Sequence, residues 1–414
     1  MTREFFVTRA LEEAKRELIA NFQFKLPRAQ SINIRKALNR VVARDVISLV
    51  DLPAFSRSTM DGYAVRAQDT HGASEQSPMY LDLVGEIKMG EEPSFKLEST
   101  ETVKISTGGM LPENADAVVM VEYTEEVGKQ VEVVRAVAPG ENVVQKGEDI
   151  QKGKPFMRQG YIIRPQDIGA LAGTGITKVQ VFRKPKVAII STGDEIVPAE
   201  EEPLIGKIRD INSFSLAAAV EKDGAVPISV GIVKDDFQTL KAKVEEALAA
   251  ADLLLLSGGS SVGTRDVTLD VIDAVGKPGV LVHGISISPG KPTIIAVCQS
   301  KPIFGLSGHP GAALTVYGIL VSPFLRYLKG EGKTLFTETP RTLKARIGMN
   351  IVSTNGRTDF VRVQLIKEDD GLWAKPIYGS SGLIATLVKA DGLICIPLEK
   401  NGLRQGEEVQ VRLF

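Results

Sequence analysis

Between residues 179 and 330 the sequence alternates short apolar strands with helical segments, and this alternation constrains the fold more than any other feature. The strand-like runs include KVAIIS, PISVGIV, DLLLLSGG and PIFGLS, and helical periodicity separates them at Ser213–Val220, Phe237–Leu248 and Val267–Val275. Such alternation is typical of a parallel sheet that is covered by helices on both faces. We therefore predict a doubly wound α/β domain over residues 179–330.

The first part of the chain has a different pattern. Apolar residues recur at helical spacing over Phe6–Ile19 and again over Ala37–Val42, which predicts two amphipathic helices. Residues 46–140 contain runs such as YLDLVGEI and ADAVVMVEY between Gly, Pro and Asn clusters, which predict a β-rich domain. Residues 141–178 combine short strands, one helix and a Gly-rich connection, and we expect them to join residues 1–45 in one helical and linker domain.

The last segment, residues 331–414, returns to strand alternation. Four Asn-Gly or Asp-Gly pairs separate its strands and indicate hairpin turns: Asn355-Gly356, Asp370-Gly371, Asp391-Gly392 and Asn401-Gly402. This pattern predicts a small β-barrel. The expected architecture is multidomain α/β plus β, with a central doubly wound α/β domain, a β-rich second domain and a C-terminal small β-barrel.

Charge and hydropathy exclude some functions. Lys and Arg total 50 against 51 Asp and Glu, so the net charge of -1 gives no general attraction to nucleic acid or to an anionic membrane. No apolar run approaches the roughly 20 residues that span a bilayer, and the first residues mix both charge signs, unlike a signal peptide. We expect a cytoplasmic protein that binds neither nucleic acid nor a membrane.

Glycine-rich turns follow the predicted strands of the α/β domain, at Thr192–Glu195, Ser257–Asp266, Ser288–Pro292 and Leu306–Gly311. In open α/β sheets, ligands bind beyond the carboxyl ends of the strands. Glycines let backbone N–H groups converge on an anion, and a following helix N-terminus adds its dipole. The second turn therefore predicts a phosphate-binding loop, and the third adds a cation, Lys291.

Three carboxylates flank the same strand ends: Glu195, Asp235 and Asp266. They would repel a phosphate unless a divalent cation lay between them, which is the usual arrangement for Mg²⁺. Each acid alone is explained as a helix cap or a surface group, and one of Asp235 and Asp236 is expected to cap the helix that begins at Phe237. Their joint occurrence at successive strand ends favours a metal site.

Two further segments are difficult to explain by packing alone. Pro53–Val65 and Ile105–Pro112 in the β-rich domain combine hydroxyl side chains, glycines and prolines. Hydroxyl groups both donate and accept hydrogen bonds, so such loops can hold a polar ligand. We interpret both segments as binding loops.

Taken together, these motifs resemble the molybdopterin molybdenumtransferase family, which comprises the MoeA proteins and the C-terminal domain of gephyrin. The resemblance runs nearly end to end and rests on eight motifs in one order. They are SRSTMDGYAV (56–65), STGGMLPENADAVVMVE (106–122), KGEDI (146–150), STGDEI (191–196), GKIRDIN (206–212), LLLSGGSSVGTRD (254–266), SPGKP (288–292) and GLSGHPGAA (305–313).

The resemblance implies a four-domain homodimer with a MogA-like pterin-binding α/β domain. It implies an enzyme that receives adenylylated molybdopterin from an upstream molybdopterin adenylyltransferase. Such an enzyme releases AMP with Mg²⁺ and inserts molybdate, which yields molybdenum cofactor. The residues leave open whether water or molybdate attacks the phosphoanhydride.

Site roles follow from the same resemblance. Asp61 and Thr107 would complete a catalytic site on the α/β domain of the partner subunit, while Glu195, Asp235 and Asp266 would serve catalysis and the metal. Arg362 and Ser381 match positions associated with oxyanion binding, where a permanently charged guanidinium suits molybdate. The expected substrate-binding residues are Ser257, Gly258, Gly259, Ser260, Ser261, Gly263, Asp210, Asn212, Lys291, Ser307, Arg362 and Ser381.

The chain also departs from the family pattern. Gly284 and Ser288 stand where family members commonly carry lysines, and residues 309–312 read His-Pro-Gly-Ala in place of an Asn-Pro-Val-Ser run. Lys291, Arg265 or His309 would have to replace the missing charge, and His309 alone is also explained as a turn residue.

Two alternatives to the enzyme reading therefore stay open. One is a divergent paralogue with tungstate preference or low activity. The other is a non-catalytic scaffold or cofactor-binding protein with the same fold. The acids Asp61, Glu195, Asp235 and Asp266 favour the enzyme, because a scaffold has no need of them.

Overall fold

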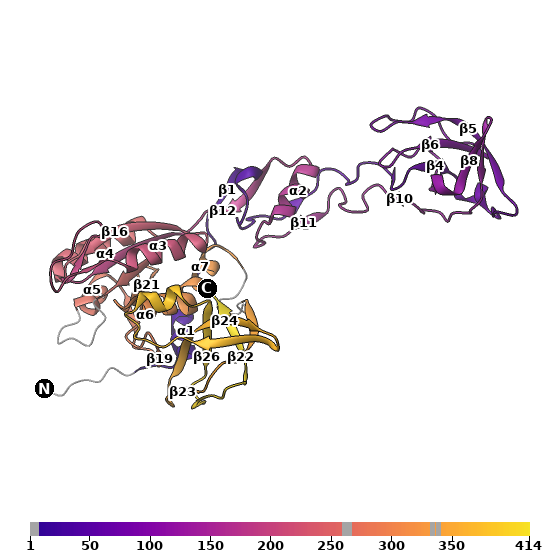
Figure 1. The fold of residues 1–414 in the computed structure, drawn as a ribbon. Helices are drawn as coiled ribbons and strands as arrows, with labels where there is room; N and C mark the ends of the chain where they lie inside the picture. The colour runs from indigo at the N-terminus through magenta and orange to yellow at the C-terminus, as the bar shows by residue number, and fades with distance from the viewer. Residues whose placement is uncertain (1–7, 259–266, 332–335, 337–340) are drawn as a thin grey trace. The chain divides into compact units, whose positions relative to one another are not determined.

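The computed structural model describes residues 8–258, 267–331, 336 and 341–414 of the chain. The chain divides into two compact units. Unit 1 comprises Met1–Gln30 and Phe182–Phe414, and unit 2 comprises Ser31–Val181 (Figure 1).

A six-stranded sheet in the order β16-β13-β17-β21-β20-β18 forms the centre of unit 1. The first four strands are parallel, whereas β20 runs antiparallel to both of its neighbours. Only two residues join β20 to β21, too few for the crossover that a parallel pair requires. The strands are β13 (Lys186–Thr192), β16 (Val226–Val233), β17 (Leu253–Ser257), β18 (Pro278–His283), β20 (Ile294–Cys298) and β21 (Lys301–Leu306).

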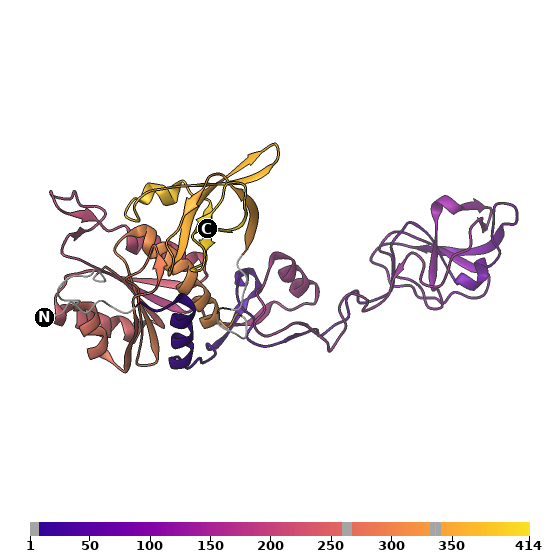
Figure 2. The same ribbon diagram turned by 90° about the horizontal axis from the view of Figure 1, so that it is seen from below.

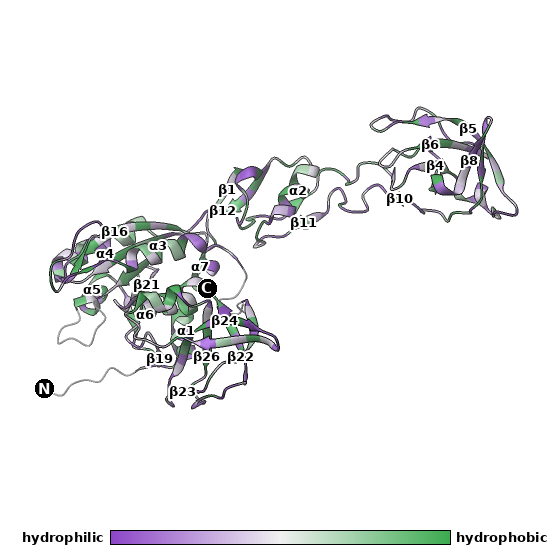
Figure 3. Ribbon diagram, in the orientation of Figure 1, coloured by the Kyte–Doolittle hydropathy of each residue, from purple (hydrophilic) through white to green (hydrophobic). Residues whose placement is uncertain are grey.

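Helices cover both faces of this sheet, which confirms the doubly wound domain. Alternate residues of β13 point to opposite faces, so Val187 and Ile189 enter one core and Ala188 and Ile190 enter the other. In Figure 3, green stretches mark hydrophobic residues in the helices that cover the sheet, for example in α3 and α6. One face packs against α1 (Leu11–Asn21), α3 (Asn212–Lys222), α6 (Pro310–Val316), a π-helical turn (Tyr317–Val321) and α7 (Ser322–Leu328), and the other against α4 (Phe237–Ala250) and α5 (Val267–Val275).

The continuous helical stretch Pro310–Leu328 is 19 residues long and apolar enough to cross a membrane by length and composition. However, 72% of it is buried inside the protein. Val316, Leu320 and Phe324 lie in the core beneath the sheet. Packing against the sheet therefore accounts for its apolar character.

The first predicted helix forms as α1, but it packs in a different place from the one expected. Ala14 and Leu18 are fully buried in the core of unit 1. From the sequence we predicted that residues 1–45 share a domain with residues 141–178. In the structure, Met1–Gln30 belong to unit 1, whereas residues 141–178 belong to unit 2. The apolar face of α1 is buried by the sheet, and not by the linker segments.

The prediction of a second helix over Ala37–Val42 is wrong. Only a short 3₁₀ turn, Ile34–Lys36, forms there, and Asn39 has a positive φ of 60° that ends any helical path. Val41 and Val42 instead form β-bridges with Ile162 and Val181. Distant strand pairing thus overrides the local helical periodicity.

This pairing belongs to a small core in unit 2 that joins residues 34–46 to residues 156–181. Its members include Ile34, Ala37, Val42, Val46, Met157, Ile163, Leu171, Val179 and Val181. Helix α2 (Pro165–Gly173) and two short strand pairs frame it: β1 (Ala29–Asn33) with β12 (Lys178–Phe182), and β2 (Val46–Ile47) with β11 (Pro155–Met157).

The predicted β-rich domain forms a six-stranded sheet in the order β7-β4-β6-β5-β9-β8. Separate apolar clusters line its surfaces, one around Tyr63 and Val119 and one around Ala64 and Val118. Its strands are β4 (Gly62–Val65), β5 (Met79–Ile87), β6 (Glu101–Ile105), β7 (Ala117–Met120), β8 (Thr124–Val127) and β9 (Gln130–Val133), and β3 (Arg57–Ser58) pairs with β10 (Val143–Val144) nearby.

The C-terminal segment forms the predicted barrel as part of unit 1. Five strands close on themselves because β24 pairs with both β25 and β26. Strand β19 (Ile287–Ser288), from a turn of the α/β domain, pairs with β24 and attaches the barrel to that domain. Figure 2 shows the barrel, in light orange and yellow, beside the α/β domain. The barrel strands are β22 (Thr342–Ile347), β24 (Thr358–Glu368), β25 (Gly371–Pro376), β26 (Gly392–Ile396) and β28 (Glu408–Leu413), with the short helix α8 (Ile384–Val388) beside them.

The packing of α1 generates the first prediction. Leu18→Ala should lower the free energy of unfolding of unit 1 by about 2–5 kcal/mol, because it leaves a cavity against the sheet. Ile19→Ala is the matched control, since Ile19 is 47% exposed and should change stability by less than about 0.5 kcal/mol. Chemical denaturation followed by circular dichroism measures both. Equal effects of the two variants would contradict the packing of α1.

Candidate active site

The carboxyl ends of β13, β17 and β21 meet at one edge of the sheet, and Gly258 holds them together. Its N–H donates to the Leu306 carbonyl over 3.1 Å. Its φ is 103°, and a Cβ at this position would lie 2.0 Å from the Thr192 carbonyl oxygen. Only glycine therefore allows β17 to end against β13.

Two buried polar side chains fix the start of α3 under this edge. Asn212 donates from Nδ2 to Ser257 Oγ at 2.7 Å and to the Gly308 carbonyl at 2.9 Å. Asp210 accepts from Ser191 Oγ at 3.0 Å and from the Ser213 N–H at 3.1 Å. Both residues were predicted to bind substrate, and the structure uses both to order the surrounding loops.

The same edge contains polar atoms that lack protein partners. Thr192 Oγ1 and Asn212 Oδ1 are buried without a hydrogen-bond partner in the part of the chain that the structure describes. Buried polar atoms are normally hydrogen-bonded, so orphaned ones at the strand ends indicate a place for a ligand or an ion. The exposed Gly308 lies next to the buried Gly258, because a Cβ on Gly308 would lie 3.8 Å from the Cα of Gly258.

Two of the three carboxylates that the sequence singled out, Glu195 and Asp235, lie close to one another. Burial raises the pKa of Asp235, and the negative charges of Asp194 and Glu195 raise it further. The nearby Thr192 hydroxyl, a possible donor to the carboxylate, acts in the opposite direction and lowers the pKa of Asp235. Acids that disfavour one another's ionised form provide a setting in which a divalent cation is stabilising.

The structure separates the roles of two adjacent aspartates. Asp236 caps α4, because it accepts hydrogen bonds from the Thr239 N–H at 2.9 Å and from the Thr239 hydroxyl at 2.7 Å. This confirms that one of the two acids is a helix cap. Asp235 has no such capping role and lies near Thr192 and Glu195.

The two residues predicted to bind an oxyanion, Arg362 and Ser381, lie in the C-terminal barrel segment near the N-terminus of α6. Arg362 is 8% exposed and donates to Thr386 Oγ1 at 2.5 Å and to the Gly379 carbonyl at 2.6 Å. Burial lowers its pKa, yet a guanidinium remains charged. A Cβ on Gly311 would lie 3.1 Å from Arg362 Nη1, so this glycine lets the guanidinium reach the N-terminus of α6.

His309 and Ser381 lie beside Arg362. Ser381 Oγ shares a hydrogen bond of 3.0 Å with His309 Nδ1, and the Ser381 carbonyl accepts from the Gly311 N–H at 2.8 Å. Ser307 Oγ accepts from the His309 N–H at 3.2 Å. The sequence contained no signal for this arrangement, because the histidine and Ser381 are 72 positions apart.

In unit 2, the structure brings the two predicted binding loops together. The Ser58 N–H donates to the Gly109 carbonyl, and the Gly108 N–H donates to the Ser58 carbonyl. Asp61 Oδ1 accepts from the Thr107 N–H at 2.7 Å and from Thr107 Oγ1 at 3.0 Å, and these bonds hold its pKa below the usual value. Asp61 is thus an exposed, ionised carboxylate that Thr107 orients by two hydrogen bonds.

Some predicted site residues lie outside the described residues: Gly259, Ser260, Ser261, Gly263 and Asp266. Lys291 is exposed in the turn after β19. In the described part of the chain, no three His, Cys, Asp or Glu side chains lie close enough to hold a metal ion by themselves. Glu195 and Asp235 therefore need additional oxygen ligands to complete such a site.

Three family models match the chain. The descriptions are "MoeA N-terminal region (domain I and II)" over residues 9–175, "Probable molybdopterin binding domain" over residues 188–327, and "MoeA C-terminal region (domain IV)" over residues 344–414. Together they cover most of the chain and agree with the resemblance identified from its motifs.

Relatives and a solved structure agree with these models. The chain is 33% identical to a molybdopterin molybdenumtransferase of Nostoc, which covers 92% of this chain and 87% of the relative. It is 31% identical to a molybdopterin molybdenumtransferase of Staphylococcus aureus, and the match covers 95% of this chain and 93% of the relative. The crystal structure of a molybdopterin biosynthesis MoeA protein from Pyrococcus horikoshii is similar, with 42% identity, a TM-score of 0.82 and 98% and 99% of the two chains covered.

Gly258 generates the second prediction. Gly258→Ala should lower the free energy of unfolding of unit 1 by about 1–3 kcal/mol more than Gly206→Ala does. Both glycines have positive φ, but a Cβ at Gly206 has nothing within 4 Å, so the difference isolates the collision with Thr192. Denaturation of both variants measures it, and equal losses would show that the strand ends do not depend on this contact.

Proposed function

Because the chain belongs to the MoeA family of molybdopterin molybdenumtransferases, we propose that it inserts molybdate into adenylylated molybdopterin in a Mg²⁺-dependent reaction that releases AMP. The family establishes an enzyme of molybdenum cofactor biosynthesis. The observation that carries the finer proposal is the position of Asp235. It is free of the capping role that Asp236 performs and lies beside the orphaned hydroxyl of Thr192.

The pterin and its phosphate would bind at the edge that Gly258 organises. Gly308 is exposed beside the buried Gly258, and the buried Asn212 Oδ1 has an accepting capacity that no described protein group uses. Ser257 accepts a hydrogen bond from Asn212 and is 1% exposed, so its side chain helps to fix the end of β17. The edge thus supplies shape and polar contacts without a cluster of lysines.

The donor atoms near Thr192 fit Mg²⁺, which prefers carboxylate and hydroxyl oxygens and retains several waters. Asp235, Glu195 and Thr192 would hold the ion, and Asp266 remains the predicted third carboxylate. Bound there, the ion would neutralise charge on the phosphoanhydride. The raised pKa of Asp235 supports this assignment, because a nearby cation favours the ionised form that burial and the neighbouring acids disfavour.

Molybdate would bind as substrate between Arg362, Ser381 and His309. The guanidinium has five N–H donors, two of which are described as bonded to Thr386 and Gly379, and the others can face an oxyanion. The hydrogen bond to Ser381 orients the imidazole of His309. This arrangement provides local positive charge, although Gly284 and Ser288 occupy positions where the family commonly has lysines.

We further propose a cytoplasmic homodimer in which Asp61 and Thr107 of one subunit complete the site of the other, with molybdopterin adenylyltransferase as the upstream partner. Asp61 is exposed and ionised, and its carboxylate is oriented by Thr107. A pre-oriented carboxylate on a surface with no described cation partner supports a role toward a ligand.

The assignment of Asp235 generates the third prediction. Asp235→Asn should reduce AMP release from adenylylated molybdopterin by at least about 100-fold, because it removes a proposed metal ligand. The assay contains Mg²⁺ and molybdate and also measures reactivation of a cofactor-free molybdoenzyme.

Asp236→Asn is the matched control, at the next position and with the same change in charge. It should cost about 1 kcal/mol or less of stability and leave AMP release near the wild-type rate, since asparagine is also a good cap. Equal activity of the two variants would refute the metal role of Asp235. Loss of activity in both would place the control residue in the site as well.

The proposed sharing of the site between subunits generates the fourth prediction. Asp61→Asn and Asp235→Asn should each be inactive alone. When the two variants are mixed and allowed to exchange subunits, about a quarter of the wild-type activity should return. Half of the dimers are then mixed, and each has one intact site of two.

A mixture of Asp235→Asn with Glu195→Gln is the control. Both changes lie in unit 1, so no mixed dimer contains an intact site and activity should stay absent. Recovery in the control, or none in the first mixture, would contradict a shared site.

A further inference from the structure

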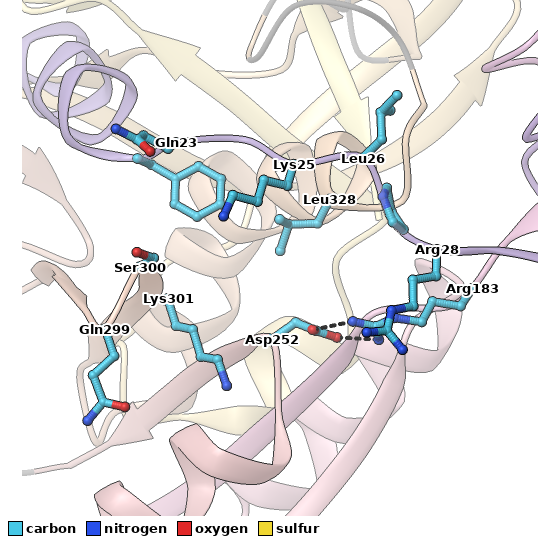
Figure 4. A pocket seen from close by; sticks show the side chains of 12 residues that line it. Gln23, Lys25, Leu26, Arg28, Arg183, Asp252, Gln299, Ser300, Lys301 and Leu328 are labelled. Carbon is cyan, nitrogen blue, oxygen red and sulfur yellow. Dashed lines mark hydrogen bonds and ion pairs between the residues drawn. The ribbon is translucent and has the colours of Figure 1, made fainter.

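A cavity of about 280 Å³ lies in unit 1 at the amino edge of the α/β sheet (Figure 4). Asp252 immediately precedes β17 and Lys301 begins β21, so these residues mark the beginnings of two parallel strands. The proposed active site follows the ends of the same strands. With five residues in β17 and about 3.3 Å per residue, the two sites are separated by roughly 16 Å of sheet.

The polar lining of the cavity is predominantly cationic. Lys25, Arg28, Arg183 and Lys301 contribute to it, and Asp252 is the one carboxylate among the lining residues that the structure describes. Figure 4 shows Arg28 and Lys301 extending toward the Arg183–Asp252 pair from different sides. The four cations come from three separate segments of unit 1, so the fold creates this concentration of charge.

Asp252 is already neutralised by its neighbours. Arg183 donates to both of its oxygens, over 2.8 and 2.6 Å, and the Lys186 N–H donates to Oδ2 at 2.8 Å. Lys301 donates to the neutral Leu248 carbonyl, and its charge helps to lower the pKa of Asp252, so that four cations face one carboxylate. Within the described chain, no ion pair involves Lys25 or Arg28. The cavity therefore has a surplus of three positive charges.

The rest of the lining is apolar on one side and polar on the other. Phe22, Leu26, Pro27 and Leu328 provide an apolar wall, and Gln23, Gln299 and Ser300 add hydrogen-bonding groups. Pockets that combine apolar walls with a few converging polar groups are typical of small-ligand sites. A phosphate ester carries a charge of about -1.5 to -2 at neutral pH and three acceptor oxygens. That charge matches the cationic surplus better than a single carboxylate does.

We propose that this cavity binds a small phosphate monoester whose apolar ring or chain lies against Phe22 and Leu26 while its phosphate contacts Lys25, Arg28 and Lys301. The arginine fork suits two phosphate oxygens at once. The site is distinct from the edge at which substrate is proposed to bind, and its occupancy does not require the catalytic residues.

Calorimetric titration of the full-length protein with phenyl phosphate tests the proposal. Lys25→Gln/Arg28→Gln should weaken binding at this site at least about tenfold, because two charge-assisted contacts are lost. Lys277→Gln/Lys367→Gln is the matched control. It removes two exposed cations elsewhere in unit 1 and should leave the affinity unchanged. Benzoate, with the same ring and one charge, and inorganic phosphate, without the ring, should each bind more weakly than phenyl phosphate.

AMP release from adenylylated molybdopterin is measured in the same variants. It should stay at the wild-type rate in Lys25→Gln/Arg28→Gln, and an unchanged unfolding midpoint shows that this variant is folded. Phenyl phosphate binding that is unchanged in this variant, or absent from the wild-type protein at millimolar concentration, would overturn the proposal. An inactive wild-type enzyme with intact, Lys25- and Arg28-dependent binding would refute the proposed function and leave this site standing.

Discussion

The contact between Gly258 and the Thr192 carbonyl is the constraint on which the candidate active site depends. Parallel strands bring their carboxyl ends to one edge, but a side chain at position 258 would force β17 away from β13. With glycine there, the end of β17 stays against β13, and the start of α3 and the turn after β21 meet beside it. Asn212 connects two of these segments through Ser257 and Gly308.

Around this edge, polar groups with structural hydrogen bonds lie near Asp235, the proposed metal ligand. The carboxylate oxygens of Asp236 and Asp210 accept hydrogen bonds from backbone N–H and hydroxyl groups of neighbouring residues. Asp235 instead remains beside Thr192, where burial and nearby acids disfavour its charge. Strand β19 pairs with the barrel, which brings Arg362 to the N-terminus of α6, so that the barrel contributes the permanent positive charge of the site.

Periodicity in the sequence predicted the α/β domain and the barrel, because their strands and helices bury alternating or regularly spaced residues. It failed at Val41 and Val42, where pairing with strands more than a hundred residues away decides the structure. The strand-end rule located Gly258 and Asp235 near one another. It could not show that Asn212 supports the loops from within, or that a histidine contacts Ser381, because such contacts join distant positions and no local pattern records them.

We propose that a divalent cation binds at the carboxyl edge of the sheet beside Asp235. Crystals grown with Mn²⁺ in place of Mg²⁺, together with adenylylated molybdopterin, test it through the anomalous scattering of manganese. We expect an anomalous difference peak within about 2.5 Å of a carboxylate oxygen of Asp235. A fully bound substrate with no peak at Asp235, or with the metal held only by other residues, would contradict it.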